Sequence, residues 1–190
     1  IGTNQIDLAA ATDRGTVVFN APFSNTRSVV ELVIAEIIAL ARRLTEKNAA
    51  MHAGVWDKSA KGAHEVRGRT LGIVGMGRIG RAVARRARGF GMRVLYSNRS
   101  RLPPGLEGGA EHFADWRAML PHCQILSLHL PGGPGNDGMM DRDAFALLPS
   151  GAVFVNAARG ALVDEDALFD ALASGRLFAA GLDVFRKEPE

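Results

Sequence analysis

A glycine-rich turn at residues 75–80 constrains the fold of this chain more than any other feature. Its sequence, Gly-Met-Gly-Arg-Ile-Gly, follows a short apolar run at residues 70–74. It opens a segment, residues 78–90, whose apolar residues recur with helical spacing. A strand that enters a helix through such a turn is typical of proteins in which strands and helices alternate. The turn therefore predicts an α/β fold.

The rest of the chain repeats this alternation. Further strands are expected at residues 92–97, 124–130, 152–157 and 178–184, and further helices at residues 113–120, 141–148 and 164–173. Strands and helices in this order form βαβ units with right-handed crossovers, and such units build a parallel sheet. The sequence therefore predicts a Rossmann-type, doubly wound parallel sheet.

Each glycine of the turn has its own physical role. Gly75 permits the tight turn, Gly77 lets backbone approach a phosphate, and Gly80 lets the helix pack closely on the strand. The start of the helix adds free N–H groups and the positive end of the helix dipole, which attract an anion. In this context the motif predicts a site for the pyrophosphate of a dinucleotide.

The end of the next strand, residues 98–101, bears on which dinucleotide binds. A carboxylate at this place would bind the ribose hydroxyls of NAD and repel a 2′-phosphate. The sequence there is Asn98-Arg99-Ser100-Arg101, with no carboxylate and two guanidinium groups, which suit a phosphate by charge and geometry. The expected cofactor is NAD or NADP, with NADP slightly favoured. The alternative is that both arginines face solvent and NAD binds.

The N-terminal stretch is expected to lead into the sheet through a hinge. A short helix is predicted over residues 2–14 and a strand-like run over residues 16–19. Residues 20–25 are rich in turn-forming residues, and they are the expected hinge.

A long apolar helix is predicted over residues 28–46. Ser28 and Glu31 form a capping-box pattern at its start. Because this helix is apolar nearly all round, it is expected to be buried, either in the core of its own domain or against a partner subunit. Residues 51–68 are predicted to form a loop.

Composition excludes several other kinds of protein. The net charge of +3 and the 6% of aromatic residues provide neither a strongly basic surface nor a stacking platform for nucleic acid. No apolar run reaches the ~18 residues of a membrane span. Cys123 is the only cysteine, so no intrachain disulfide forms; a cytoplasmic setting and a buried thiol are expected. No Cys/His spacing indicates a metal site.

Several long stretches resemble the D-2-hydroxyacid dehydrogenase family. They are IGTNQIDLAAA, FNAPFSNTRSVVELV, GVWDKSAKGAHEVRGRTLGIVGMGRIG and the tail from NAARG to DVFRKEP. All but the tail resemble its phosphoglycerate dehydrogenase branch in particular. The resemblance implies a two-domain enzyme. Residues 1–24 would be the end of the substrate domain and the hinge, and residues 25–190 the dinucleotide-binding domain. The rest of the substrate domain would lie outside the chain at both ends, and the cofactor domains would form a homodimer.

The resemblance also assigns roles to single residues. Arg159 matches the catalytic arginine, which can hold a substrate carboxylate and polarise the neighbouring oxygen. Glu188 matches the glutamate that raises the pKa of a catalytic histidine, and that histidine is expected beyond the end of this chain. The other matches concern binding: Asn25 on the substrate side, and Arg78, Ile79, His129, Pro131, Ala157, Ala158 and Asp183 on the cofactor side.

Together these matches imply an oxidoreductase that transfers a hydride between a nicotinamide cofactor and a D-2-hydroxy acid. The expected substrate is 3-phospho-D-glycerate, in a route to L-serine. An NADPH-dependent glyoxylate or hydroxypyruvate reductase is an alternative, because the run Asn98-Arg99-Ser100 resembles that of such reductases. A more distant alternative is a non-catalytic protein of the same fold that binds a dinucleotide as a signal.

Overall fold

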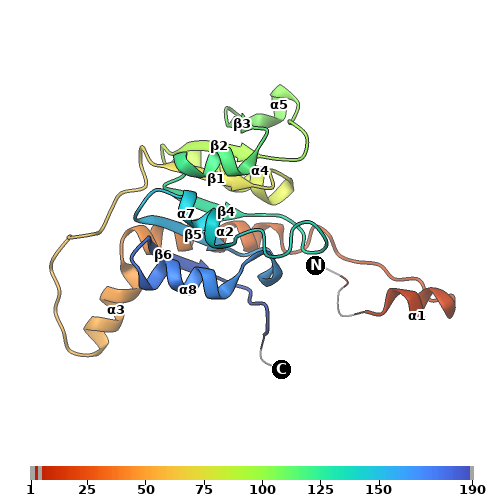
Figure 1. The fold of residues 1–190 in the computed structure, drawn as a ribbon, viewed down its shortest axis with the longest axis horizontal. Helices are drawn as coiled ribbons and strands as arrows, with labels where there is room; N and C mark the ends of the chain where they lie inside the picture. Colours follow the sequence, from red (N-terminus) through yellow and green to blue (C-terminus); the bar gives the residue numbers. More distant parts are fainter. Residues whose placement is uncertain (1–2, 4–5, 189–190) are drawn as a thin grey trace.

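The computed structural model describes residue 3 and residues 6–188, with a six-stranded sheet at the centre (Figure 1). The strands are β1 (Thr70–Val74), β2 (Arg93–Ser97), β3 (Glu111–Phe113), β4 (Ile125–Leu128), β5 (Ala152–Asn156) and β6 (Leu177–Leu182). They lie in the order β3-β2-β1-β4-β5-β6, and every neighbouring pair is parallel. The chain winds outward from β1 and then in the opposite direction from β4, which confirms the predicted doubly wound fold. The change of direction places a crevice at the carboxyl ends of β1 and β4.

Helices cover both faces of this sheet. α2 (Thr26–Ala41) packs against α4 (Arg78–Gly89) and crosses β5 and β6 on one face. α7 (Arg142–Leu147) and α8 (Glu165–Ala173) pack together on the other. Leu71 and Ile73 of β1 belong to the apolar cluster that includes side chains of α2 and α4, and Val74 belongs to the cluster that includes side chains of α7 and α8, as the alternation of side chains along a strand requires. Burial on both faces explains why the strands read as continuous apolar runs.

Cys123 is buried beneath β1, as expected. Its Sγ donates a hydrogen bond to Met119 O at 3.2 Å, and burial raises the pKa of the thiol to about 12. A Cβ on Gly72 would lie 2.2 Å from this sulfur, so glycine at that position of β1 makes room for the thiol. Cys123 is therefore a packing residue.

The helix predicted over residues 28–46 is two helices, so that prediction was wrong at both ends. α2 begins at Thr26 without a side-chain cap, and both Ser28 and Glu31 are exposed. The capping box does not form because Ser28 already lies inside the first turn. At the other end Arg43 has a φ of 55°, in the left-handed region, which separates α2 from α3 (Leu44–His52).

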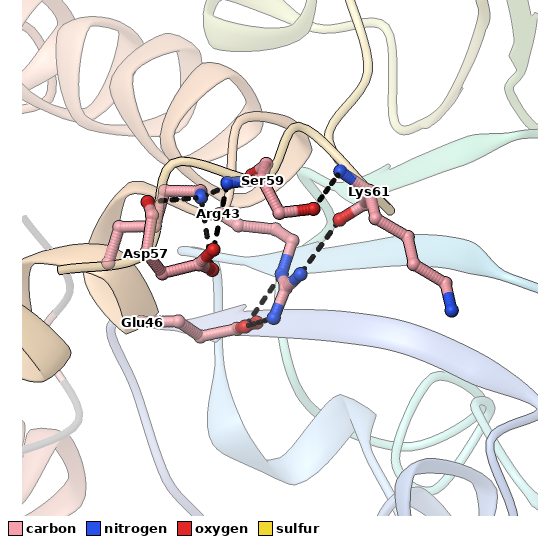
Figure 2. Close-up of polar contacts among 6 residues, drawn as sticks. Arg43, Glu46, Asp57, Ser59 and Lys61 are labelled. Atoms are coloured by element: carbon pink, nitrogen blue, oxygen red, sulfur yellow. Dashed lines mark hydrogen bonds and ion pairs between the residues drawn. The ribbon is translucent and has the colours of Figure 1, made fainter. Parts of the chain in front are cut away.

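Side-chain contacts hold the corner between α2 and α3 (Figure 2). The Arg43 guanidinium donates to Glu46 Oε2 at 2.7 Å and to the carbonyl oxygen of Lys61 at 2.8 Å. The Ser59 N–H donates to Asp57 Oδ1 at 2.8 Å, and this bond is the largest contribution to lowering the pKa of Asp57. These bonds fasten part of the segment between α3 and β1, which Figure 1 shows as a long irregular connection. The predicted loop begins after His52.

The N-terminal stretch packs little against the sheet. α1 (Leu8–Asp13) lies within the helix predicted over residues 2–14, of which residues 2, 4 and 5 lie outside the described residues. Asp7 caps α1 by accepting from Ala10 N at 2.9 Å. No side chain of α1 is buried. Residues 16–19 form no strand, contrary to prediction, because no described strand lies beside them to pair with.

The region between β2 and β4 holds elements that the sequence did not predict. α5 (Pro104–Glu107) and the three-residue strand β3 lie there, and both are too short to give a periodic pattern. The helix expected over residues 113–120 is shorter, because α6 (Trp116–Met119) passes into a 3₁₀ turn at residues 120–122. A second 3₁₀ turn occupies residues 160–162. Within the described ranges, no helix is both long and apolar enough to cross a bilayer.

Candidate cofactor and substrate site

The glycine turn between β1 and α4 is shaped by close backbone contacts. Gly75 has a φ of +99°, and a Cβ there would lie 2.7 Å from the carbonyl group of His129. A Cβ on Gly80 would lie 2.4 Å from the carbonyl oxygen of Gly75. Gly77 differs, because a Cβ there would meet no atom within 4 Å. The turn is therefore packed on its inner side and open at Gly77.

Gly77 is also the residue that caps α4. It provides no side-chain cap, so the first N–H groups of the helix have no partner from a capping side chain. Free N–H groups at the positive end of a helix dipole, beside open space, suit a phosphate. The residues present therefore fit the pyrophosphate of a dinucleotide.

A cleft of about 320 Å³ adjoins this turn at the carboxyl edge of the sheet. The hinge, the first turn of α4 and the loops after β4 and β5 all contribute to its walls. Eight of the predicted site residues line it: Asn25, Arg78, Ile79, His129, Pro131, Ala157, Ala158 and Arg159. The structure thus brings together residues as far apart in the sequence as Asn25 and Arg159.

A second cleft of about 970 Å³ continues from the first. Pro131 and Arg159 belong to both clefts, and Glu188 lines the second. Arg159 is exposed, and its Nη1 donates to Ala158 O at 2.6 Å. Glu188 is exposed and accepts only a long bond, 3.4 Å, from Phe185 N. Both predicted catalytic side chains therefore face one cleft and are accessible to a substrate.

Two residues that shape the loop after β5 were assigned no role from the sequence. Asn156 is fully buried; its Nδ2 donates to Arg159 O at 2.9 Å and its Oδ1 accepts from Ala158 N at 3.1 Å. A Cβ on Gly160 would lie 2.0 Å from the carbonyl group of Phe185. These contacts fix the backbone on both sides of Arg159. The signal available was the run Asn-Ala-Ala-Arg-Gly itself, since asparagine and glycine mark turns.

In the loop after β2, the predicted ribose-binding residues have contacts that the sequence did not indicate. Asn98 Oδ1 accepts from Met76 N at 2.6 Å, which ties the loop to the glycine turn. Arg99 and Ser100 are exposed and line neither cleft. Arg101 is paired with Glu107, with Nε 2.8 Å from Oε1. Two guanidinium groups were expected to be available to a phosphate, but because Arg101 is paired with Glu107, only that of Arg99 is available.

A buried tyrosine holds this loop from below. The Tyr96 hydroxyl donates to Glu107 Oε1 at 2.8 Å and accepts from Leu102 N at 3.1 Å. Burial and the neighbouring Glu107 raise the pKa of Tyr96, so the hydroxyl keeps its proton. Hydrogen bonds from Arg101 and Tyr96 lower the pKa of Glu107. The carboxylate is therefore occupied by the loop's own contacts.

Two further ionisable groups lie near the site. His129 Nε2 is 3.0 Å from Ser127 Oγ, and burial lowers the pKa of His129 to about 4, so its ring is neutral at pH 7. Asp183 is exposed after β6, its N–H donates to Asn156 O at 3.1 Å, and it lines neither cleft. Burial and then the charge of Asp183 raise the pKa of Glu36 on α2. Among the described residues, no group of three or more potential ligands could hold a metal ion.

The fold and the cleft define a dinucleotide-binding domain of the Rossmann class. The profile of one family, described as "D-isomer specific 2-hydroxyacid dehydrogenase, NAD binding domain", matches residues 34–190. The chain belongs to this family.

Relatives and solved structures agree with this assignment. The chain is 49% identical over 190 residues to D-3-phosphoglycerate dehydrogenase of Haemophilus influenzae, and 43% identical over 189 residues to D-3-phosphoglycerate dehydrogenase 1 of Saccharomyces cerevisiae. It is fully covered by both matches but spans only 46% and 40% of those proteins. A glyoxylate reductase structure from Paecilomyes thermophila matches the whole chain with a TM-score of 0.90 and 39% identity, over 57% of its own length. A Granulicella formate dehydrogenase matches the whole chain with a TM-score of 0.94 and 30% identity, over 51% of its length.

Proposed function

We propose that this chain is the cofactor domain of a nicotinamide-dependent dehydrogenase acting on D-2-hydroxy acids. The observation that carries the proposal is the convergence of eight predicted residues from four separate segments on one cleft beside an open helix N-terminus. The bound cofactor would supply the hydride chemistry. The protein would supply orientation and charge.

The chain's own residues have separate tasks in this proposal. The N–H groups at the start of α4 bind the pyrophosphate, and Ala157 and Ala158 flank the nicotinamide. Arg159 holds the substrate carboxylate and stabilises charge on the C2 oxygen, because an exposed guanidinium on a fixed loop can form a bidentate pair. Glu188, across the same cleft, raises the pKa of a histidine that takes the proton of the hydroxyl.

The proposed substrate is 3-phospho-D-glycerate, in a route to L-serine. The names of the relatives at 49% and 43% identity support it. Glyoxylate or hydroxypyruvate is the alternative, supported by the glyoxylate reductase structure at 39% identity and by the Asn98-Arg99-Ser100 run. Steady-state rates with 3-phosphoglycerate and with glyoxylate on the full-length protein decide between the two. Dinucleotide binding without turnover of either acid would favour the non-catalytic alternative.

We further propose that NADP binds in preference to NAD. Asn98 stands where a carboxylate would select NAD, and Arg99 is the guanidinium of this loop that no described side chain engages. The 2′-phosphate would pair with Arg99. Titration of the chain with NADPH and NADH, followed by nicotinamide fluorescence at low salt, is the test.

In that titration we expect NADPH to bind more tightly than NADH. Arg99→Gln should weaken NADPH binding about tenfold, the loss of one charge-assisted contact, and leave NADH unchanged. Arg142→Gln, an exposed arginine on the far helix α7, is the control for the loss of one positive charge. Tighter binding of NADH by the wild type would overturn the preference for NADP and leave the dehydrogenase proposal intact.

A homodimer is proposed as the assembly. Apolar side chains that a monomer would leave in water gather on α3 and on the segment after it: Leu44, Met51, Val55 and Trp56 are 47–68% exposed. Exposed apolar groups in one region are typical of association surfaces. Sedimentation of the chain, whose monomer mass is 20.3 kDa, reports directly whether it dimerises.

A further inference from the structure

Helix α4 carries an unusual concentration of positive charge. Its 12 residues include five arginines and no acidic residue: Arg78, Arg81, Arg85, Arg86 and Arg88. Like charges three and four residues apart repel each other, and a cation in the first turn opposes the helix dipole. Arg86 and Arg88 lie in the last turn, where a cation suits the dipole, but Arg78, Arg81 and Arg85 gain no such stabilisation.

The described part of the protein provides no counter-charge for these arginines. Arg81 Nε donates to Gly77 O at 3.3 Å and Arg86 Nη1 to Ala82 O at 3.2 Å, which are carbonyl groups of their own helix. None of the ion pairs among the described residues includes an arginine of α4. Neither Arg85 nor Arg88 has a hydrogen-bond partner there, and both are exposed.

Four of the five arginines share one groove. A groove of about 410 Å³ lies between α4 and α5, and its α4 wall carries Arg78, Arg81, Arg85 and Arg88. Its other wall is formed by residues 105–108. Among the described residues that line the groove, Glu107 is the only acidic one, and its carboxylate is already bound by Arg101 and Tyr96. The groove therefore presents guanidinium groups without a competing free carboxylate.

The far end of the groove is built around one of these guanidinium groups. Gly109 has a φ of +78°, and a Cβ there would lie 2.5 Å from Arg88 Nη1 and 2.7 Å from Arg88 Cζ. The Arg88 guanidinium thus lies directly on the backbone of Gly109, and any side chain at that position would displace it. The groove begins at the other end beside Met76, in the glycine turn.

We propose that this groove binds an oligophosphate, the chain of phosphates found in a nucleoside triphosphate or in inorganic tripolyphosphate. From Arg78 to Arg88 the helix rises about 15 Å, which exceeds what a single small anion can contact. A ligand with several linked phosphates neutralises several guanidinium groups at once and matches their fork geometry. The volume of 410 Å³ suits a small ligand. This site runs along the side of α4 and shares Arg78 with the cleft assigned to the cofactor. The Arg78 guanidinium also donates to Pro22 O and lies 4.1 Å from the centre of the Phe23 ring, so Arg81, Arg85 and Arg88 are the arginines that belong to this groove alone.

The test is calorimetric titration of the chain with tripolyphosphate at low salt. The Arg85→Gln/Arg88→Gln double variant should bind it about tenfold more weakly or worse, because two charge-assisted contacts are lost. The matched control is Arg93→Gln/Arg142→Gln. It removes the same charge from arginines that are 56% and 70% exposed and lie outside the groove. Equal weakening in both double variants would mean diffuse charge attraction and overturn the site.

Three further arms sharpen the result. ATP in place of tripolyphosphate identifies the source of the phosphates: equal affinity means that the phosphate chain alone is recognised, and tighter binding means a nucleotide. Saturating NADPH should leave tripolyphosphate binding in place; its abolition would make the groove part of the cofactor site and overturn the proposal. Tighter binding of a single-stranded oligonucleotide through the same two arginines would overturn it in favour of nucleic acid.

Discussion

The glycine turn at residues 75–80 and the loop at residues 98–110 follow neighbouring strands, yet they are held by different means. The turn is held by backbone packing, since added atoms at Gly75 or Gly80 would collide with carbonyl groups. The loop is held by side chains, through the Tyr96 hydroxyl and the Glu107 carboxylate. The turn should therefore fail when an atom is added, whereas the loop should fail when a polar atom is removed.

Gly80→Ala should break the turn and have the largest effect. Its Cβ would lie 2.4 Å from Gly75 O and 3.2 Å from Ile73 Cγ2, and neither backbone nor a buried strand can yield cheaply. Overpacking of this kind costs about 3 kcal/mol of unfolding free energy. Alanine gains about 1 kcal/mol in helix propensity, which does not offset the collision. Urea unfolding followed by circular dichroism measures the net loss.

Gly77→Ala is the matched control within the same turn. Its Cβ would meet nothing within 4 Å, and the backbone there is in an ordinary extended conformation. Its unfolding free energy should stay within about 0.5 kcal/mol of the wild type. If the two variants were equally stable, backbone packing would not be what holds the turn.

His129, which packs against the glycine turn, should make the stability of the protein depend on pH. Its carbonyl group lies beneath Gly75, and burial lowers its pKa to about 4 from an unfolded value near 6.5. The unfolded chain therefore takes up the proton first as pH falls. Stability should be fully present above pH 6.5, decline by about 2 kcal/mol by pH 5, and continue to fall toward pH 4.

Unfolding midpoints at pH 7.5, 6, 5 and 4 measure this decline. His129→Gln should flatten it, since glutamine does not titrate. His52→Gln, at an exposed histidine on α3, should keep the wild-type slope. A slope that survives in the His129 variant would assign the acid sensitivity to other groups.

The same contrast explains what the sequence could predict. The glycine turn could be predicted because it is specified by glycines at a fixed spacing directly after a strand. The gathering of Arg159, His129 and Ile79 follows as well, since the carboxyl ends of parallel strands meet at one edge. The pairing of Tyr96 with Glu107 could not be predicted, because Glu107 lies 11 residues after Tyr96 and their contact depends on the path of the loop between them. The left-handed backbone conformation of Arg43 could not be predicted either, because no residue type around it indicates such a conformation.

Tyr96→Phe should loosen the loop with an intermediate effect. It leaves the ring in place but removes the hydroxyl that serves both Glu107 and Leu102 N. Two buried bonds are lost, one to a charged group, so the unfolding free energy should fall by about 1–2 kcal/mol. The urea midpoint measures it, and an unchanged midpoint would mean that the loop does not depend on this hydroxyl.

Arg101→Gln should change the unfolding free energy least, because Arg101 is the most exposed member of the hydrogen-bonded group formed with Glu107 and Tyr96. The Arg101 side chain is 65% exposed, whereas its partner Glu107 is only 11% exposed and keeps its bond to Tyr96. An exposed ion pair is offset by side-chain entropy and by solvent, so no measurable change in the urea midpoint is expected. NADPH affinity should also stay at the wild-type value, because Arg101 is held by Glu107 and only Arg99 is free to meet a 2′-phosphate. If Arg101→Gln weakened NADPH binding as much as Arg99→Gln, the loop would have to open when the cofactor binds. Its side-chain contacts would then be a resting arrangement, in contrast to the fixed backbone of the turn.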